Sequence, residues 1–201
     1  MELRWLEKQS LKHWRSPRLL RFAGAVLLGA LVSVTWPSAA VQLGDGTTAF
    51  NSPPRLDSFI TFDERAQDRN TTYYVTVRLL PEAGEPLQTL SVSLVEGRFN
   101  RLNYRTEQIS VYGGQPRDRS TAYPIETADY DADSQTLTIR LAQPAEPGQT
   151  LTFELELVRN PRFGGVYLYD VVAAPAGENP RFQRIGTGRI HIYDRPRRVF
   201  P

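Results

Sequence analysis

The sequence predicts an all-β protein, an antiparallel β-sandwich that is immunoglobulin-like in the broad sense, with a small β-barrel as the alternative. Beyond position 41, apolar and polar residues alternate with period two in segment after segment, which is the pattern of half-buried strands. Clusters of Gly, Pro and Asp separate these segments, as turns do. No dozen-residue stretch in this region has the 3.6-residue period of an amphipathic helix.

Seven or eight short strands follow from this alternation. A short helical turn also fits between residues 87 and 103, although Gly97 argues against a long helix. Residues 58–62 and 109–112 are weaker strand candidates. The clearest strands, with apolar residues at every second position, are expected within residues 73–79, 90–94, 137–141, 151–157, 166–172 and 189–193.

Residues 1–40 have the pattern of a secretory signal peptide. They carry six Lys and Arg against two acids, a net charge of +4, and Phe22–Trp36 is a stretch of 15 residues without a charge. Small residues then precede Val41, where cleavage is expected after Ala40. Because the apolar stretch is shorter than the roughly 20 residues of a spanning helix, cleavage is favoured over the alternative, an uncleaved membrane anchor.

The remaining 161 residues predict a single β-sandwich domain over 41–194 and a basic C-terminal tail over 195–201. This part holds 18 Arg and 20 acids, a net charge of −2, so the pI of about 9.0 belongs to the leader. Nucleic-acid binding is therefore not expected, since it requires a basic patch on the folded domain. The absence of Cys excludes a disulfide framework.

Catalytic side chains are scarce after residue 40, and the sequence predicts no catalytic residue and no organic cofactor. The single His, His191, alternates with Ile190 and Ile192 and should face solvent, and no Gly-x-Ser-x-Gly motif or Lys is present. Zinc sites draw on several His and Cys ligands. Carboxylates are abundant, and Glu154 and Glu156 share a strand face, so a carboxylate-based hydrolase of envelope polysaccharide is an alternative.

One short motif has the opening of a calcium loop. Asp129, Asp131 and Asp133 place three carboxylates at every second position, and calcium prefers several oxygen ligands. The rest of the motif departs from such a loop, because Ser134 replaces the turn Gly and Arg140 stands where a closing Glu is needed. A hairpin turn before the strand at Leu137 is the simpler interpretation, and weak calcium binding by these three Asp residues is the alternative.

The C-terminal tail is a candidate contact with the envelope. Arg195, Arg197 and Arg198 put three positive charges on a mildly acidic domain, and such a tail is either solvated or attached to anionic polymers or lipid head groups through a salt-sensitive contact. Aromatic side chains offer a second route to a ligand. Tyr74, Tyr167 and Tyr169 are expected on the outward faces of the sheets, where they pair across strands or stack on sugar rings.

Several short motifs resemble a cyanobacterial family of exported proteins known only as a domain of unknown function. They are Asn51-Ser52-Pro53-Pro54, a Tyr-Tyr strand followed by Ala83-Gly84-Glu85-Pro86-Leu87, the loop Pro175-Ala176-Gly177-Glu178-Asn179-Pro180, and Gly186-x-Gly188-Arg189. The resemblance covers most of the chain after residue 41, and more weakly residues 97–130. It implies export and one compact domain, and it identifies no catalytic residues. At Asp170, the family leads us to expect an uncharged residue.

These observations predict an exported, non-enzymatic β-sandwich module that acts by binding or by structural association in the cell envelope. A weak calcium-dependent adhesion module is a further alternative beside the hydrolase. The expected location is the periplasm or the exterior, with the thylakoid lumen as the alternative that the family resemblance implies. If the leader is cleaved, no membrane span follows it in the sequence.

Overall fold

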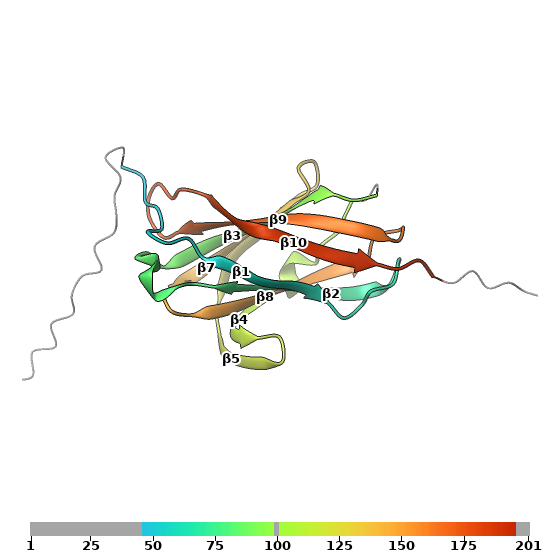
Figure 1. Cartoon of the computed structure of the whole chain (residues 1–201), viewed down its shortest axis with the longest axis horizontal. Helices are drawn as coiled ribbons and strands as arrows, with labels where there is room; N and C mark the ends of the chain where they lie inside the picture. The colour runs from blue at the N-terminus through green and yellow to red at the C-terminus, as the bar shows by residue number, and fades with distance from the viewer. Residues whose placement is uncertain (1–45, 99–100, 196–201) are drawn as a thin grey trace, which may run out of the picture. The chain divides into compact units, whose positions relative to one another are not determined.

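The computed structural model describes residues 46–98 and 101–195 as two five-stranded antiparallel sheets packed face to face (Figure 1). One sheet has the strand order β1-β2-β8-β4-β5 and the other the order β10-β9-β3-β7-β6. The predicted antiparallel β-sandwich is confirmed. The strands are β1 (Arg55–Thr61), β2 (Arg69–Arg78), β3 (Leu87–Glu96), β4 (Ser110–Gln115), β5 (Asp118–Ala122), β6 (Ile125–Asp131), β7 (Thr136–Ala145), β8 (Thr150–Arg159), β9 (Gly165–Pro175) and β10 (Gln183–Ile192).

Helical structure in the described residues is limited to two 3₁₀ turns, η1 (Pro81–Ala83) and η2 (Thr106–Gln108). Residues 87–96, where the sequence also allows a helical turn, are strand throughout. None of the helices in these parts of the chain is long and apolar enough to cross a membrane. The predicted leader, residues 1–40, lies outside the described residues.

The period-two alternation places the core between the sheets. On β8, Leu151, Phe153, Leu155 and Leu157 are fully buried and face apolar side chains of the second sheet. Burying each such side chain stabilises the fold by about 1.5–3 kcal/mol. On the outer face of a sheet, the same alternation places polar side chains of adjacent strands opposite each other. The hydroxyls of Thr76 and Thr152, for example, are hydrogen-bonded at 3.0 Å.

The weaker candidates at 58–62 and 109–112 correspond to β1 and β4, whereas β5 and β6 were not predicted. Every residue of β5 is exposed, so its sequence does not alternate between apolar and polar residues. β6 is an edge strand with a mostly polar sequence, and Ile125, Ala128 and Tyr130 pack on the core while remaining partly exposed. Edge strands with little burial carry a weak period-two signal.

The prediction that Tyr167 and Tyr169 face outward is wrong, because both are fully buried. On β9 the intervening residues, such as Val166 and Asp170, form the outer face instead. The ring of Tyr169 stacks on Phe59 with a centroid separation of 4.8 Å. Aromatic side chains bury more area than valine or leucine, which explains why the tyrosine face of this strand turns inward. Tyr74 is half-buried and lies on the outer face as expected.

An edge strand of one sheet lies close to an edge strand of the other. β1 and β10 pack against each other, and the Cβ of a larger residue at Gly188 would lie 2.3 Å from the ring of Phe59. A Cβ at Gly186 would lie 2.8 Å from the side chain of Leu56. The Gly-x-Gly motif therefore allows the edges of the two sheets to approach each other.

The remaining family-like motifs meet at one end of the sandwich. The Asn51 amide donates to the Ala83 carbonyl at 2.8 Å, and the Ala176 amide donates to the Pro86 carbonyl at 2.9 Å. The Asn51 side chain also occupies the space beside Gly84. These contacts support a structural role for the motifs in joining the loops of this end. β9 begins at the opposite end of the sandwich with Gly165 and finishes at this end with Pro175 (Figure 1).

Candidate functional site

Loops far apart in the sequence are held together at the end of the sandwich where β1, β8 and β10 finish. Gln67 N–H donates to the Pro161 carbonyl at 3.0 Å, and Tyr193 N–H donates to the Glu64 carbonyl at 2.7 Å. The residues after β1, after β8 and after β10 thus form one continuous surface, which lies at the right of Figure 1.

Asn160 fixes the centre of this surface. It is 2% exposed, and its side-chain amide donates to the backbone carbonyls of Asp63 and Arg65 while its Oδ1 accepts from the Tyr73 hydroxyl at 2.9 Å. Its backbone N–H donates to the Asp68 carbonyl at 2.8 Å. A buried amide with all these partners holds the 63–68 loop rigidly against the end of β8.

Two arginines stand directly opposite each other at this end. Arg69 begins β2 and Arg159 ends β8, and the register of the two strands makes them cross-strand partners. Within the described residues, neither guanidinium has a hydrogen-bond or ion-pair partner. Like charges at directly opposed positions destabilise a sheet. The arrangement therefore raises the local positive potential at a cost in stability.

Arg195, from the segment that follows β10, completes the surface around this pair. Together with Gln67 it lines a pocket of about 440 Å³ with Arg69 and Arg159, which we call the Arg69 pocket. Arg195 is held by its Nε, which donates to the Ala66 carbonyl at 3.1 Å, and by an ion pair with Asp68 at 2.6 Å. Of the three predicted tail contacts, Arg195 is therefore tied to the folded domain, while Arg197 and Arg198 lie outside the described residues.

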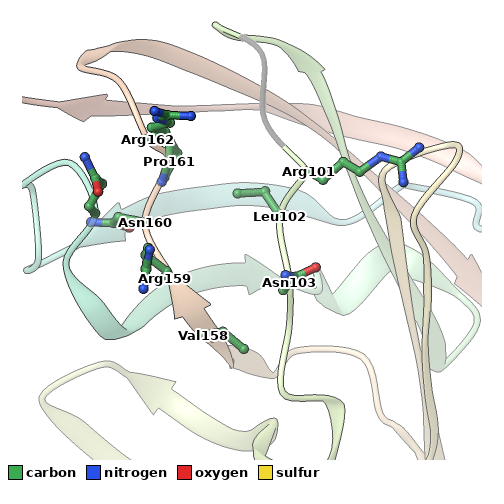
Figure 2. A pocket seen from close by; sticks show the side chains of 9 residues that line it. Arg101, Leu102, Asn103, Val158, Arg159, Asn160, Pro161 and Arg162 are labelled. Atoms are coloured by element: carbon green, nitrogen blue, oxygen red, sulfur yellow. The ribbon is translucent and has the colours of Figure 1, made fainter.

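A second pocket of about 530 Å³, the Leu102 pocket, adjoins the first and shares Gln67 and Arg159 with it. Figure 2 shows Leu102 and Asn103 on one wall and residues 158–162 on the other. Arg101 and Arg162 also line it, and the Arg101 side chain extends away from the 158–162 wall. No Asp or Glu is among the described residues that line either pocket.

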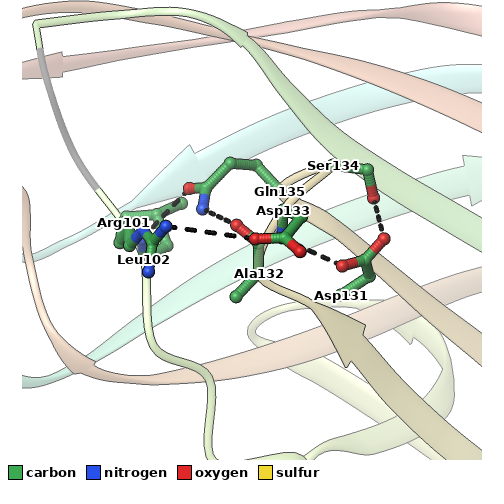
Figure 3. A network of polar contacts seen from close by, with 7 residues as sticks. All are labelled: Arg101, Leu102, Asp131, Ala132, Asp133, Ser134 and Gln135. Carbon is green, nitrogen blue, oxygen red and sulfur yellow. Dashed lines mark hydrogen bonds and ion pairs between the residues drawn. The ribbon is translucent and has the colours of Figure 1, made fainter.

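The β6–β7 turn, which contains the predicted calcium motif, supports the wall of the Leu102 pocket (Figure 3). Gln135 accepts a hydrogen bond from Leu102 N–H at 3.2 Å through its Oε1, and its side-chain nitrogen donates to the Ala132 carbonyl at 2.8 Å. Asp133 lies 3.9 Å from Arg101. The turn thus fixes the position of residues 101–103.

The hairpin turn predicted before Leu137 is present, and it satisfies its own carboxylates. Asp131 accepts from Asp133 N–H at 2.9 Å and from the Ser134 hydroxyl at 2.7 Å. The Ser134 hydrogen bond, followed by the Asp133 amide, lowers the pKa of Asp131. Asp129 lies on the exposed face of β6, and the described residues contain no cluster of three His, Cys, Asp or Glu that could hold a metal ion. Calcium binding by these residues stays a prediction.

An acidic pocket of about 440 Å³ lies beside the arginines. Asp63, Glu64, Asp68 and Asp194 line it together with Arg65. Asp194 accepts from Gly164 N–H at 2.6 Å. This end of the sandwich therefore has a basic side and an acidic side, joined by the Arg195–Asp68 ion pair.

The other residues considered from sequence lie apart from these pockets. Glu154 and Glu156 share the outer face of β8 as expected, but Glu154 is mostly covered by Arg119, with which it forms an ion pair at 2.7 Å. Glu156 accepts from the Thr72 hydroxyl at 2.7 Å. His191 is exposed on β10, as predicted.

Sequence reasoning identified only Arg195 among the arginines that line the pockets. Arg69, Arg101, Arg159 and Arg162 are distributed over nearly a hundred residues, and only strand pairing brings them together. One sequence feature could have pointed to two of them. Arg69 lies just before the predicted Tyr-Tyr strand, and Arg159 lies just after the predicted strand at 151–157. Their register could not be derived from that signal.

Comparison with known proteins gives a family match and weak structural likenesses. Residues 47–192 match the model of a family described as a protein of unknown function, DUF2808. No curated protein matches the chain.

Solved structures with similar folds have low identity to the chain. The collagen-binding domain of a Staphylococcus aureus adhesin is 4% identical over 62% of this chain and 88% of that one, with a TM-score of 0.37. BslA, a bacterial hydrophobin, is 12% identical over 72% of this chain and 97% of that one, with a TM-score of 0.40. A DUF4466 family protein from Parabacteroides merdae is 10% identical over 72% and 45%, with a TM-score of 0.43. None of these likenesses bears on function.

Proposed function

Because the chain belongs to the DUF2808 family, whose function is unknown, we propose its function from its own surface. It is an exported, non-enzymatic β-sandwich module that binds anionic groups of the cell envelope through the Arg69 pocket and the Leu102 pocket. Binding without turnover agrees with the few catalytic side chains of the chain after residue 40.

The observation that carries this proposal is the opposition of Arg69 and Arg159 without a carboxylate between them. A ligand anion between the two guanidinium groups would convert their repulsion into two charge-assisted hydrogen-bonded contacts. Arginine suits this role, since its planar fork matches carboxylate, sulfate and phosphate oxygens. Arg195 would approach the same anion from a third side.

Export to the periplasm or the exterior is part of the proposal and is supported by the sequence of the leader. A basic segment, an uncharged apolar stretch of 15 residues and small residues before Val41 are the three features of a secretory signal. The thylakoid lumen is the alternative compartment, and an uncleaved leader would instead anchor the domain at the membrane.

The test is thermal unfolding of the protein in sulfate and in chloride at equal ionic strength. We compare it with the double variant Arg69→Gln/Arg159→Gln and with Arg181→Gln, which removes an exposed arginine at the opposite end. Sulfate should raise the Tm of the wild type and of Arg181→Gln more than that of the double variant, since only a bound anion depends on the pair. Equal sulfate effects in all three proteins would refute anion binding at this end.

The same experiment has a second readout. In chloride, the double variant should be as stable as the wild type or more stable, because neutral Gln relieves the repulsion between opposed charges. A large loss of stability on removing both charges would mean that the arginines serve the fold.

The acidic pocket favours a second candidate, a carboxylate-based hydrolase of envelope polysaccharide. Its carboxylates lie beside two exposed aromatic side chains, Phe62 and Tyr193, that could receive a sugar ring. Asp63 and Glu64 would be the acid–base pair. This candidate requires turnover that is lost in Asp63→Asn and Glu64→Gln, and binding without any turnover would exclude it.

The third candidate is weak calcium-dependent adhesion through Asp129, Asp131 and Asp133. It requires a calcium-induced rise in Tm that Asp131→Ala reduces. No calcium effect on the Tm of the wild type would end this candidate.

A further inference from the structure

We propose that the ligand is a linear acidic polysaccharide whose successive acidic sugars occupy the Arg69 pocket and the Leu102 pocket. This inference rests on the anion-binding function proposed above and assigns its ligand class. It follows from how the two pockets are joined and from what lines them besides arginine.

The two pockets form one continuous binding surface. Both include Gln67 and Arg159, so a chain could pass from one to the other without leaving the protein. Each pocket also has arginines of its own: Arg69 and Arg195 line the first, and Arg162 lines the second, where the Arg101 side chain extends toward Asp133 instead. A single small anion would engage only one of these sets. Positive groups repeated on both sides of Arg159 match a ligand with repeated negative groups.

The Leu102 pocket has the chemistry of a sugar site as well as a positive charge. Its lining includes the exposed amide side chains of Asn103 and Gln67, which can bond to hydroxyl groups. Val158, which is 39% exposed, adds apolar surface on which the C–H face of a sugar ring can lie. A uronic acid carries all three complementary features, whereas a phosphate or sulfate ion uses only the charge.

The shared wall is preformed. Gln67 has a φ of 62°, a left-handed conformation that is unusual for a residue with a side chain. Its N–H is bound to the Pro161 carbonyl, and the adjacent loop is fixed by the buried Asn160. Backbone strain that is held in place by surrounding bonds is often found at binding sites. A fixed wall between the pockets lowers the entropy cost of ordering the protein around a chain.

The way the two pockets are joined favours a polymer chain over a lipid surface. Both pockets are open to solvent and share Gln67 and Arg159, so a chain can follow them from one to the other. Lipid head groups in a bilayer form a broad surface and are better matched by basic residues on a convex or planar face.

The inference is tested by isothermal titration calorimetry of the protein with galacturonic acid and with its linear hexamer. The hexamer should bind at least about tenfold more tightly per sugar than the monomer, because the second pocket is then filled intramolecularly. Arg69→Gln in one pocket and Arg162→Gln in the other should each weaken hexamer binding by about three- to tenfold. Arg181→Gln, at the opposite end, should leave it unchanged.

The outcomes separate the ligand class from the function. If monomer and sulfate bind in a manner that Arg159→Gln abolishes, but the hexamer gains nothing per sugar, the polysaccharide inference is wrong and anion binding stands. If no anion binds, both are wrong. If phosphatidylglycerol vesicles bind through Arg159 and the hexamer does not, the occupant is a lipid surface and the inference is overturned.

Discussion

Asn160 is the single side chain that most directly maintains the arginine-lined end. Replacing it with Ala removes two donors and one acceptor and leaves the carbonyls of Asp63 and Arg65 and the Tyr73 hydroxyl without their partner. Burial also raises the pKa of the Tyr73 hydroxyl, so it stays a neutral donor that needs an acceptor. We expect Asn160→Ala to lower the free energy of unfolding by about 2–4 kcal/mol.

Urea denaturation measures this change, and sulfate binding reports on the site. The loss should be accompanied by weaker anion binding, since the 63–68 loop carries Gln67 and the Asp68 carboxylate that orients Arg195. A fully stable Asn160→Ala variant would contradict the role assigned to this amide.

A second residue, Asp170, makes the stability of the fold depend on pH. It occupies a position where an uncharged residue was expected, and it forms an ion pair with Arg184 at 2.7 Å on the outer face of β9 and β10. The hydrogen bond from Arg184, helped by that from Thr187, lowers the pKa of the carboxyl below its ordinary value of 3.8. The charged aspartate therefore does not disturb strand pairing, because its partner lies on the adjacent strand.

A lowered folded-state pKa fixes the sign of the effect on stability. The contribution of the pair is present above the unfolded-state pKa of about 4 and is lost as the pH falls through the lower folded-state value. Asp170→Asn should therefore reduce stability slightly at neutral pH, by at most about 1 kcal/mol, and make the acid-induced decrease in Tm shallower. Arg184→Gln should have the same effect, and acid profiles identical to that of the wild type would contradict it.

At the scale of elements, the edge formed by β1 and β10 depends on the absence of a side chain at Gly188. An added methyl group would overlap the ring of Phe59, which is itself stacked on Tyr169. We expect Gly188→Ala to destabilise the fold by about 1–3 kcal/mol, because Phe59 must shift within a packed core. Chemical denaturation measures this loss, and Gly46→Ala is a useful contrast, since its Cβ would meet nothing within 4 Å.

The Gly46→Ala comparison separates crowding from backbone conformation. Gly46 has a φ of 79°, so this substitution is strained by its backbone but not by contact. If Gly188→Ala is no more destabilising than Gly46→Ala, the close approach of β1 and β10 is not what the Gly-x-Gly motif serves.

Sequence alone predicted the elements that bury an apolar face and missed those that do not. β2 and β8 alternate strictly because one face of each forms the core, and their alternation identified them. β5 is wholly exposed, and no pattern in its side chains indicates that it pairs with β4. Alternation also does not say which face is inner, so the mixed apolar and aromatic sequence of β9 was assigned the wrong way round at Tyr167 and Tyr169.

The candidate site could be predicted only in part, for a related physical reason. Arg195 stood out because it belongs to a local cluster of charge, whereas Arg69 and Arg159 acquire their significance from strand register. The acidic turn at 131–135 was correctly identified as a turn. Its second role, holding Leu102 through Gln135, depends on a contact over 33 residues that no local pattern encodes.

At the scale of the whole molecule, the loops at the two ends of the sandwich differ in character. One end is closed by backbone hydrogen bonds among the family-like motifs, and the other carries two arginine-lined pockets and an acidic one. The net charge of −2 after residue 40 does not reveal that basic and acidic side chains are gathered in separate pockets. A module of this kind would attach to an anionic polymer by one end and leave its other end free.

The most direct test is fractionation of cells that produce the protein, with a salt wash and a mass measurement. We expect a form processed after Ala40 that sediments with the envelope and is released by salt. Arg181→Gln should behave in the same way, and Arg69→Gln/Arg159→Gln should stay in the soluble exported fraction. Envelope association that is unaffected by salt and by the double variant, or a protein that is never exported, would be inconsistent with anion binding by an exported module.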